Sequence, residues 1–93
     1  MSEYVQVHFT NGMLETVGDG TYGCFEIKQH IGGVPPVANI DYVEYGDNTS
    51  FTLWSELNCT GRAWGPYQDN LSGTHEFHPP LPAKSVSIAF FHS

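Results

Sequence analysis

Two histidines and a glutamate stand within four residues of one another, at His75-Glu76-Phe77-His78. Imidazole and carboxylate groups are zinc ligands, and histidines three positions apart share one face of a helix. The segment is short and Pro79-Pro80 follows it, so we expect extended chain, in which positions three apart point to opposite faces. The pattern therefore favours two surface histidines over a zinc site. The other histidines show no ligand spacing: His8, His30 and His92.

Two cysteines, Cys24 and Cys59, allow one disulfide at most. Small secreted domains that depend on disulfides usually contain more than two cysteines. The opening residues Met1–Tyr4 do not resemble a signal peptide, which begins with a basic stretch followed by an apolar run. We therefore expect both thiols to be reduced and buried as small hydrophobic side chains, and the protein to be cytoplasmic.

Catalytic motifs are missing from the sequence. Cys24 or Cys59 beside a histidine is the one candidate nucleophile, and there is no Gly-X-Ser-X-Gly, no phosphate-binding loop and no supported pair of carboxylates. We expect a protein that is not an enzyme and that needs no organic cofactor.

The charge balance excludes several classes of partner. The 93 residues include 10 acidic and 3 basic side chains, for a net charge of −7. Three scattered cations, Lys28, Arg62 and Lys84, cannot neutralise a nucleic-acid backbone or hold an anionic membrane surface. No apolar run approaches the length of a membrane span. We expect one soluble domain that is monomeric or self-associates weakly.

Turn residues interrupt the chain every few positions, because it contains ten glycines and six prolines. Short alternating segments rich in β-branched and aromatic residues lie between the turns, which is typical of an antiparallel sandwich or barrel. We expect a loop over Leu14–Gly23 and no central strand through Pro79-Pro80-Leu81-Pro82, because proline lacks the N–H of a strand ladder. The predicted strands are Tyr4–Phe9, Cys24–Lys28, Asn39–Tyr45, Ser50–Trp54, Arg62–Trp64, Thr74–His78 and Ser85–Phe91.

The two halves of the chain repeat the same spacing. The opening strands around Val5–Phe9 and Phe51–Trp54 lie about 45 residues apart, and so do the closing strands Ile40–Tyr45 and Ser85–Phe91. This indicates two four-stranded units. We predict an all-β fold in which two Greek-key motifs, about residues 1–46 and 47–93, form one antiparallel β-sandwich and one domain over 1–93.

The stretch from Phe51 to Gly61 resembles the first hairpin of a βγ-crystallin Greek key. The family pattern is an aromatic residue, four others, a second aromatic, one other and a glycine. Trp54 and Gly61 fit it, Asn58 stands at the polar turn position, and Cys59 replaces the second aromatic. The segment Ala83–Ile88 is similar to the closing strand of the family, which begins with a serine. The resemblance implies that Trp54 packs buried over the hairpin and that only glycine suits position 61.

The resemblance extends over the whole chain and is closest to the single-domain microbial branch of the family, fungal members included. Many microbial members bind calcium just before each closing strand, through the pattern Asn/Asp, Asn/Asp, two free residues, Ser/Thr, Ser. Aligned on the first closing strand, Asp41-Tyr42 takes the Ser/Thr-Ser place and Val37-Ala38 the acid places. The resemblance thus implies a degenerate, weak calcium site at Asp41, with the carbonyl oxygen of Asn39.

The second calcium position is expected to be lost. There Lys84-Ser85 takes the Ser/Thr-Ser place and Leu81 an acid place, and an ammonium group repels the ion. Asp47-Asn48-Thr49-Ser50 and Asp69-Asn70-Leu71-Ser72 carry suitable residue types but precede the wrong strands, and turn formation explains them better.

The expected function follows from the family resemblance and the charge. We expect a stable, soluble structural or storage protein without enzymatic activity, because a strong net charge favours solubility. The alternatives are a calcium-binding βγ-crystallin module and, less favoured, a small secreted toxin or protease inhibitor.

Overall fold

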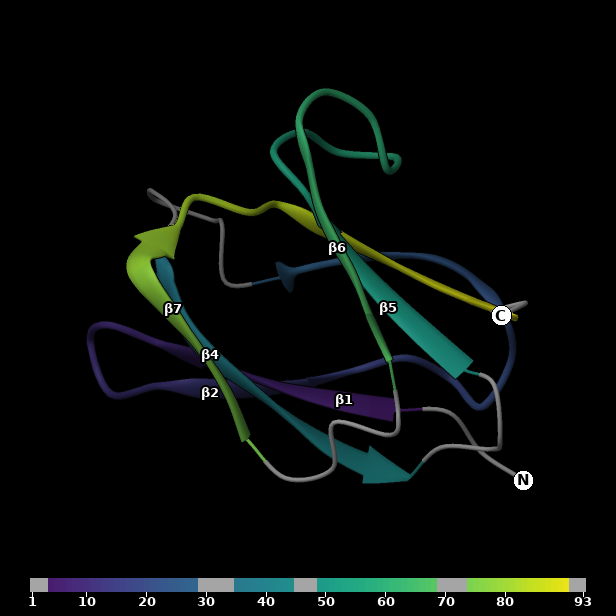
Figure 1. Ribbon diagram of the computed structural model, residues 1–93, viewed down its shortest axis with the longest axis horizontal. Coiled ribbons are helices and arrows are strands. Elements are labelled where there is room, and N and C mark those ends of the chain that lie inside the picture. The colour runs from purple at the N-terminus through teal and green to yellow at the C-terminus, as the bar shows by residue number, and fades with distance from the viewer. Residues whose placement is uncertain (1–3, 29–34, 45–48, 69–73, 91–93) are drawn as a thin grey trace.

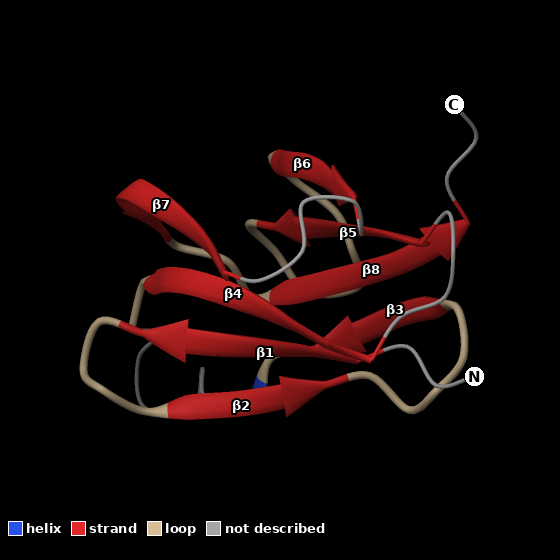
Figure 2. Cartoon of the chain, turned by 60° about the horizontal axis from the view of Figure 1, so that its bottom comes forward, coloured by secondary structure: helices blue, strands red, loops and turns tan. Residues whose placement is uncertain are grey.

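The computed structural model describes residues 4–28, 35–44, 49–68 and 74–90. Those residues form two four-stranded antiparallel sheets that pack together in a sandwich-like arrangement (Figures 1 and 2). Within the described chain there is no helix long and apolar enough to cross a membrane. The strands are β1 Tyr4–Phe9, β2 Leu14–Val17, β3 Gly23–Glu26, β4 Val37–Glu44, β5 Thr49–Trp54, β6 Ala63–Gln68, β7 Thr74–Leu81 and β8 Ser85–Phe90.

The two halves of the chain exchange one strand each. The first sheet has the order β2-β1-β4-β7, and the second has the order β3-β8-β5-β6. Each sheet therefore contains the first, second and fourth strands of one half of the chain. Its remaining strand is the third strand of the other half. Replacing β1, β2 and β4 by the strands four later, and β7 by the strand four earlier, reproduces the order of the second sheet. This symmetry agrees with the repeat of two four-stranded units predicted from the spacing.

Side-chain alternation explains why these segments are strands. In β1, Val5, Val7 and Phe9 are buried, while the alternate residues Tyr4, Gln6 and His8 are half-buried on the outer face. A period of two buries one row of side chains between the sheets. The shared core consists of Val5, Val7, Phe9, Val17, Ile27, Val37, Ile40, Phe51, Leu53, Phe77, Leu81, Ala83, Val86 and Ile88.

Strand β2 corrects one prediction, because its residues were expected to begin a loop. Leu14–Val17 pairs with β1 in register, with Val5 opposite Val17, and this pairing buries Val17 against the core. Leu14 is half-exposed, so the segment lacks a strong hydrophobic pattern of its own. A strand that is stabilised by its neighbour is difficult to recognise from local composition.

Two proline-containing strands extend further than predicted. Strand β6 continues through Gly65-Pro66, and β7 continues through Pro79-Pro80 to Leu81. Both are edge strands, β6 of the second sheet and β7 of the first. An edge strand tolerates proline because a missing N–H there need not break a ladder bond. The rule against proline in a central strand is therefore respected.

The expectation that both cysteines are reduced and buried is wrong. Cys24 of β3 and Cys59 of the β5–β6 hairpin form a disulfide with Cα atoms 6.0 Å apart. Cys24 is exposed and Cys59 half-buried. The reason is tertiary: Cys24 lies beside Ser87 of β8, and the hairpin that contains Cys59 folds over the start of β8 at Ser85. A sequence separation of 35 residues hides this proximity.

Candidate functional site

The hairpin between β5 and β6 is held by a buried serine. Ser85 is 0% exposed, and its hydroxyl donates to the carbonyl oxygen of Glu56 at 2.6 Å. The same hydroxyl oxygen accepts the backbone N–H of Cys59 at 3.0 Å. One side chain at the start of β8 therefore satisfies a donor and an acceptor of a hairpin that precedes it by more than twenty residues, and fixes the hairpin over the sheet.

Gly61 closes the same hairpin and has no room for a side chain. Its φ is +83°, in the region that glycine adopts without steric cost. A Cβ at this position would collide with Ser55 Oγ and would lie 2.8 Å from Glu56 Cγ. The prediction that position 61 requires glycine is confirmed.

The prediction that Trp54 packs buried over the hairpin is wrong. Its side chain is half-buried rather than buried, and its indole N–H donates to Ser87 Oγ at 2.9 Å. The ring thus lies along the outer face of the second sheet, beside β8. Because Trp54 keeps part of its surface in water, it contributes less to the core than expected.

The predicted calcium residues lie within a strand. Asn39 and Asp41 belong to β4 and are half-buried on the outer face of the first sheet. His8 Nε2 lies 2.7 Å from Asp41 Oδ2, and 30% of the histidine and 32% of the aspartate side chain are exposed. Asn39 lies opposite both His8 of β1 and Glu76 of β7. Asp41 therefore has an ion-pair partner close by, and calcium binding there stays a prediction.

The strand register explains why these residues are not in a loop. Ser85 is opposite Trp54 in the second half, and the corresponding pair in the first half is Val37 opposite Phe9. The structural counterpart of Ser85 is therefore Val37, and Asp41 follows it by four residues. A bulge between His8 and Phe9 contributes to this offset, and bulges are not visible in the sequence spacing.

The described part of the chain contains no second group of candidate metal ligands. Over the described ranges, no group of three or more His, Cys, Asp or Glu side chains could hold a metal ion. His78 is exposed on β7, as expected for a surface histidine. The segments Asp47-Asn48 and Asp69-Asn70-Leu71-Ser72 lie outside the described residues.

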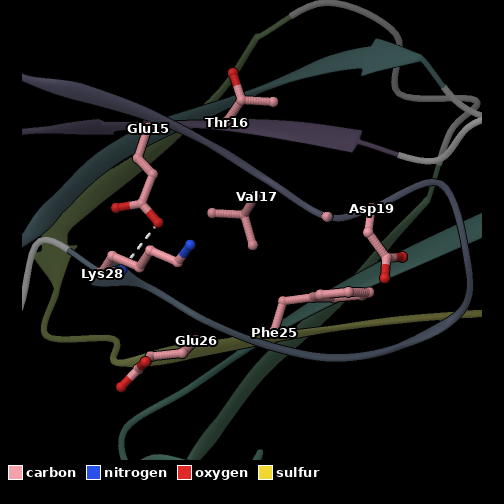
Figure 3. Close-up of a pocket in the computed structure, with 8 residues that line it drawn as sticks. Glu15, Thr16, Val17, Asp19, Phe25, Glu26 and Lys28 are labelled. Carbon is pink, nitrogen blue, oxygen red and sulfur yellow. Dashed lines mark hydrogen bonds between the residues drawn. The ribbon is translucent and has the colours of Figure 1, made fainter.

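A hollow of about 390 Å³ lies beside β2 and β3 and contains several carboxylates. Glu15 Oε2 accepts the backbone N–H of Lys28 at 2.9 Å, and Asp19 accepts the N–H of Thr21 at 3.0 Å. Figure 3 shows the carboxyl group of Glu26 pointing away from that of Glu15. Glu15 thus holds the chain after β3 to β2, and Asp19 stabilises its own turn. The carboxyl groups of Glu15 and Glu26 do not converge on one point.

A second groove, of about 440 Å³, lies between the edge strands β6 and β7. Both strands run along the same side of the two sheets (Figure 2). Strand β6 contributes Trp64 and Tyr67, and Arg62 lines the groove from the position just before β6. Strand β7 contributes Glu76, Phe77 and His78, and the proline-rich residues 79–82 complete the wall. We call this the edge groove.

A bulge in β6 directs two aromatic rings into the edge groove. Tyr67 is opposite Phe51 and Trp64 is opposite Leu53, so three residues of β6 span two of β5. Without the shift, Trp64 and Tyr67 would point to opposite faces. With it, both lie on the inner face beside the core and remain half-buried.

The rings of the edge groove contact one another across the two sheets. The Tyr67 and Phe77 ring centroids are 5.3 Å apart with the planes tilted by 56°. The guanidinium of Arg62 lies 5.4 Å from the centre of the Trp64 ring. Burial raises the pKa of the Tyr67 phenol above its ordinary value. The sequence did not predict this groove, although Gly65-Pro66 directly after Trp64 was a sign of an irregular strand.

Comparison with known proteins returns no matching family model, no matching curated protein and no matching solved structure.

Proposed function

We propose that this chain is a βγ-crystallin-like domain with a structural role, stable and soluble rather than enzymatic. The strand order supports two Greek keys. In a Greek key the fourth strand returns to lie beside the first. Here β4 pairs with β1 and β8 pairs with β5, while each third strand, β3 or β7, joins the sheet of the other half.

The observation that carries the proposal is the contact between Ser85 and the folded hairpin. The family resemblance requires a serine at the start of the closing strand and a glycine at the hairpin. The Ser85 hydroxyl bonds to both Glu56 and Cys59, and Gly61 has a positive φ in a crowded turn. The serine and the glycine that the family pattern specifies thus belong to one hydrogen-bonded hairpin, which supports the resemblance.

The disulfide changes the expected location. A bond between Cys24 and Cys59 persists in oxidising environments and is rare in reducing ones. We therefore propose an oxidising compartment or the outside of the cell, in preference to the cytoplasm expected from the sequence. Small secreted toxins and protease inhibitors usually contain disulfides, so this bond is compatible with that alternative.

The calcium-module alternative depends on Asp41. Calcium takes six to eight oxygen ligands, and affinity rises with the number of charged ones. The Asp41 carboxylate lies 2.7 Å from an imidazole nitrogen of His8, which competes with a cation when it is protonated. A structural role therefore accounts for the arrangement at Asp41 better than a tight calcium site.

Thermal unfolding with and without calcium tests the proposal, combined with sedimentation at high protein concentration. A ligand that binds only the native state at a hundredfold excess over Kd adds about 2.7 kcal/mol of stability. We expect at most a small rise in Tm at millimolar calcium, and a monomer that stays in solution when concentrated. A large rise in Tm at micromolar calcium would instead identify a calcium module.

A further inference from the structure

The tripeptide Asn-X-Ser/Thr occurs more often in this chain than the composition predicts. The chain contains five asparagines, and three of them begin such a tripeptide: Asn48, Asn58 and Asn70. Ser and Thr together make up 14 of the 93 residues, so chance predicts fewer than one such tripeptide among five asparagines. In secreted proteins this tripeptide is the acceptor for N-linked glycosylation.

Asn58 is the member of this set that lies within the described residues, and its position leaves room for a large group. It lies in the turn between β5 and β6 and is exposed, as is Thr60, which completes the tripeptide. Its φ is +61°, a backbone conformation that asparagine tolerates better than most residues with a Cβ. A group attached to the Asn58 side chain therefore extends from the surface and leaves the core intact.

The surface beside Asn58 is hollowed. Asn58 lines an open space of about 310 Å³ together with Cys24, Glu26 and Leu57. Leu57 is 39% exposed, so its apolar side chain is partly in contact with water. A sugar attached to Asn58 has this open space beside it, and its attachment displaces no packed side chain.

The disulfide is an independent observation that points the same way. Cys59, the middle residue of the Asn58–Thr60 tripeptide, is bonded to Cys24. Such bonds form in the lumen of the secretory route, where N-linked glycosylation also takes place, and are rare in reducing compartments. The modification and the bond therefore require the same route.

The folded hairpin holds the tripeptide in a closed turn. The backbone N–H of Cys59 donates to the buried Ser85 hydroxyl. The Thr60 hydroxyl donates to the carbonyl oxygen of Leu57 at 2.8 Å. Asn58 and Cys59 both have a positive φ, at +61° and +53°. A transferase that binds all three residues must open this turn, which the disulfide opposes, so transfer is easier before the disulfide closes.

We propose that Asn58 is an N-glycosylation site that is modified before the disulfide closes, which rests on the oxidising location proposed above. The donor is an oligosaccharide carried on a lipid pyrophosphate. The amide nitrogen of Asn58 forms a bond to the anomeric carbon of the first sugar, and the bond from that carbon to the pyrophosphate oxygen breaks. The lipid pyrophosphate leaves with the bonding electrons, and the amide nitrogen gives up one proton to a base of the transferase.

Secretion of the full-length chain from a eukaryotic host, followed by peptide mass mapping, tests the proposal. An amidase that removes N-glycans in heavy-oxygen water converts each glycosylated asparagine to labelled aspartate, so each site is read separately. We expect label at Asn58. Thr60→Ala should abolish it and Thr60→Ser should keep part of it, because the motif requires a hydroxyl two positions after the asparagine. Asn11→Gln is the control at an exposed asparagine outside the motif, and should leave the label unchanged.

The order of events is tested in vitro with purified transferase and a lipid-linked donor. The reduced wild type and Cys24→Ser, which cannot form the disulfide, should accept the sugar at Asn58 several-fold faster than the oxidised wild type. Equal rates would overturn the order of events. An unlabelled Asn58 in the secreted wild type would overturn the site itself. Free thiols in that secreted protein would instead contradict the disulfide from which the location is inferred, and a thiol assay measures them separately from the label.

Discussion

Cys24 and Cys59 join the third strand of one half of the chain to the β5–β6 hairpin of the other half. Strand β3 already pairs with β8, and the hairpin is held to the start of β8 by Ser85. The disulfide therefore ties together two elements that share β8 as their neighbour. It reinforces the place where β3 of the first half joins the sheet of the second half.

Removal of the disulfide should lower the free energy of unfolding by about 2–4 kcal/mol, since a cross-link between distant residues restricts the unfolded chain. The measurement is guanidinium unfolding of the wild type and of the double variant Cys24→Ser/Cys59→Ser. Reductant should destabilise the wild type and leave the variant unchanged. Two thiols that react in the native, unreduced protein would contradict the bond.

Ser85→Ala should cost about 1–3 kcal/mol, because it leaves the Glu56 carbonyl and the Cys59 N–H without their partner. Ser87→Ala is the matched control on the same strand. It removes one bond, from the indole of Trp54, whose N–H can turn to water, and should cost about 0.5–1.5 kcal/mol. Equal losses in chemical denaturation would mean that Ser85 does not hold the hairpin.

Gly61→Ala and Gly12→Ala separate crowding from backbone strain. The two glycines have nearly the same φ, +83° and +88°. A Cβ at Gly12 meets nothing within 4 Å, whereas one at Gly61 collides with the hairpin. Gly12→Ala should lower the free energy of unfolding by about 1–3 kcal/mol, because of its φ alone. Gly61→Ala should lower it by about 1–3 kcal/mol more, because its Cβ also overpacks the hairpin. Comparable melting temperatures for the two variants would remove the crowding argument.

The Tyr67 phenol makes stability depend on alkaline pH. Its pKa is raised by burial, so above about pH 10 the unfolded chain loses this proton before the native protein does. The native state then binds more protons, and stability falls as pH rises through the folded pKa, while below the unfolded pKa nothing is lost. The free energy of unfolding, measured between about pH 9 and pH 11, should decline less in Tyr67→Phe than in the wild type. Tyr22→Phe, at an exposed ring, should decline like the wild type.

Calcium binding, if it occurs at the predicted place, should depend on Asp41 and be opposed by His8. Any rise in Tm with millimolar calcium should vanish in Asp41→Ala and increase in His8→Ala, which removes the 2.7 Å partner. Asp19→Ala is the control, at an exposed acid in the loop between β2 and β3. A rise that survives Asp41→Ala would locate the ion elsewhere.

The sequence by itself determined the all-β class, most of the strands and the special hairpin positions. Alternation in Tyr4–Phe9 and in Ser85–Phe90 predicts which side chains are buried, and that local pattern is a direct consequence of strand geometry. Gly61 was recognisable because a positive φ restricts the residue type at one position, whatever lies around it.

Only the tertiary structure decided what depends on chain segments far apart. The pairing of Cys24 with Cys59, the existence of β2, and the position of Asp41 inside β4 all depend on strand register and on bulges, which local composition does not encode. The edge groove has the same origin. Trp64 and Phe77 belong to different sheets, and they line one groove because the two halves of the chain place β6 and β7 on the same side of the sandwich.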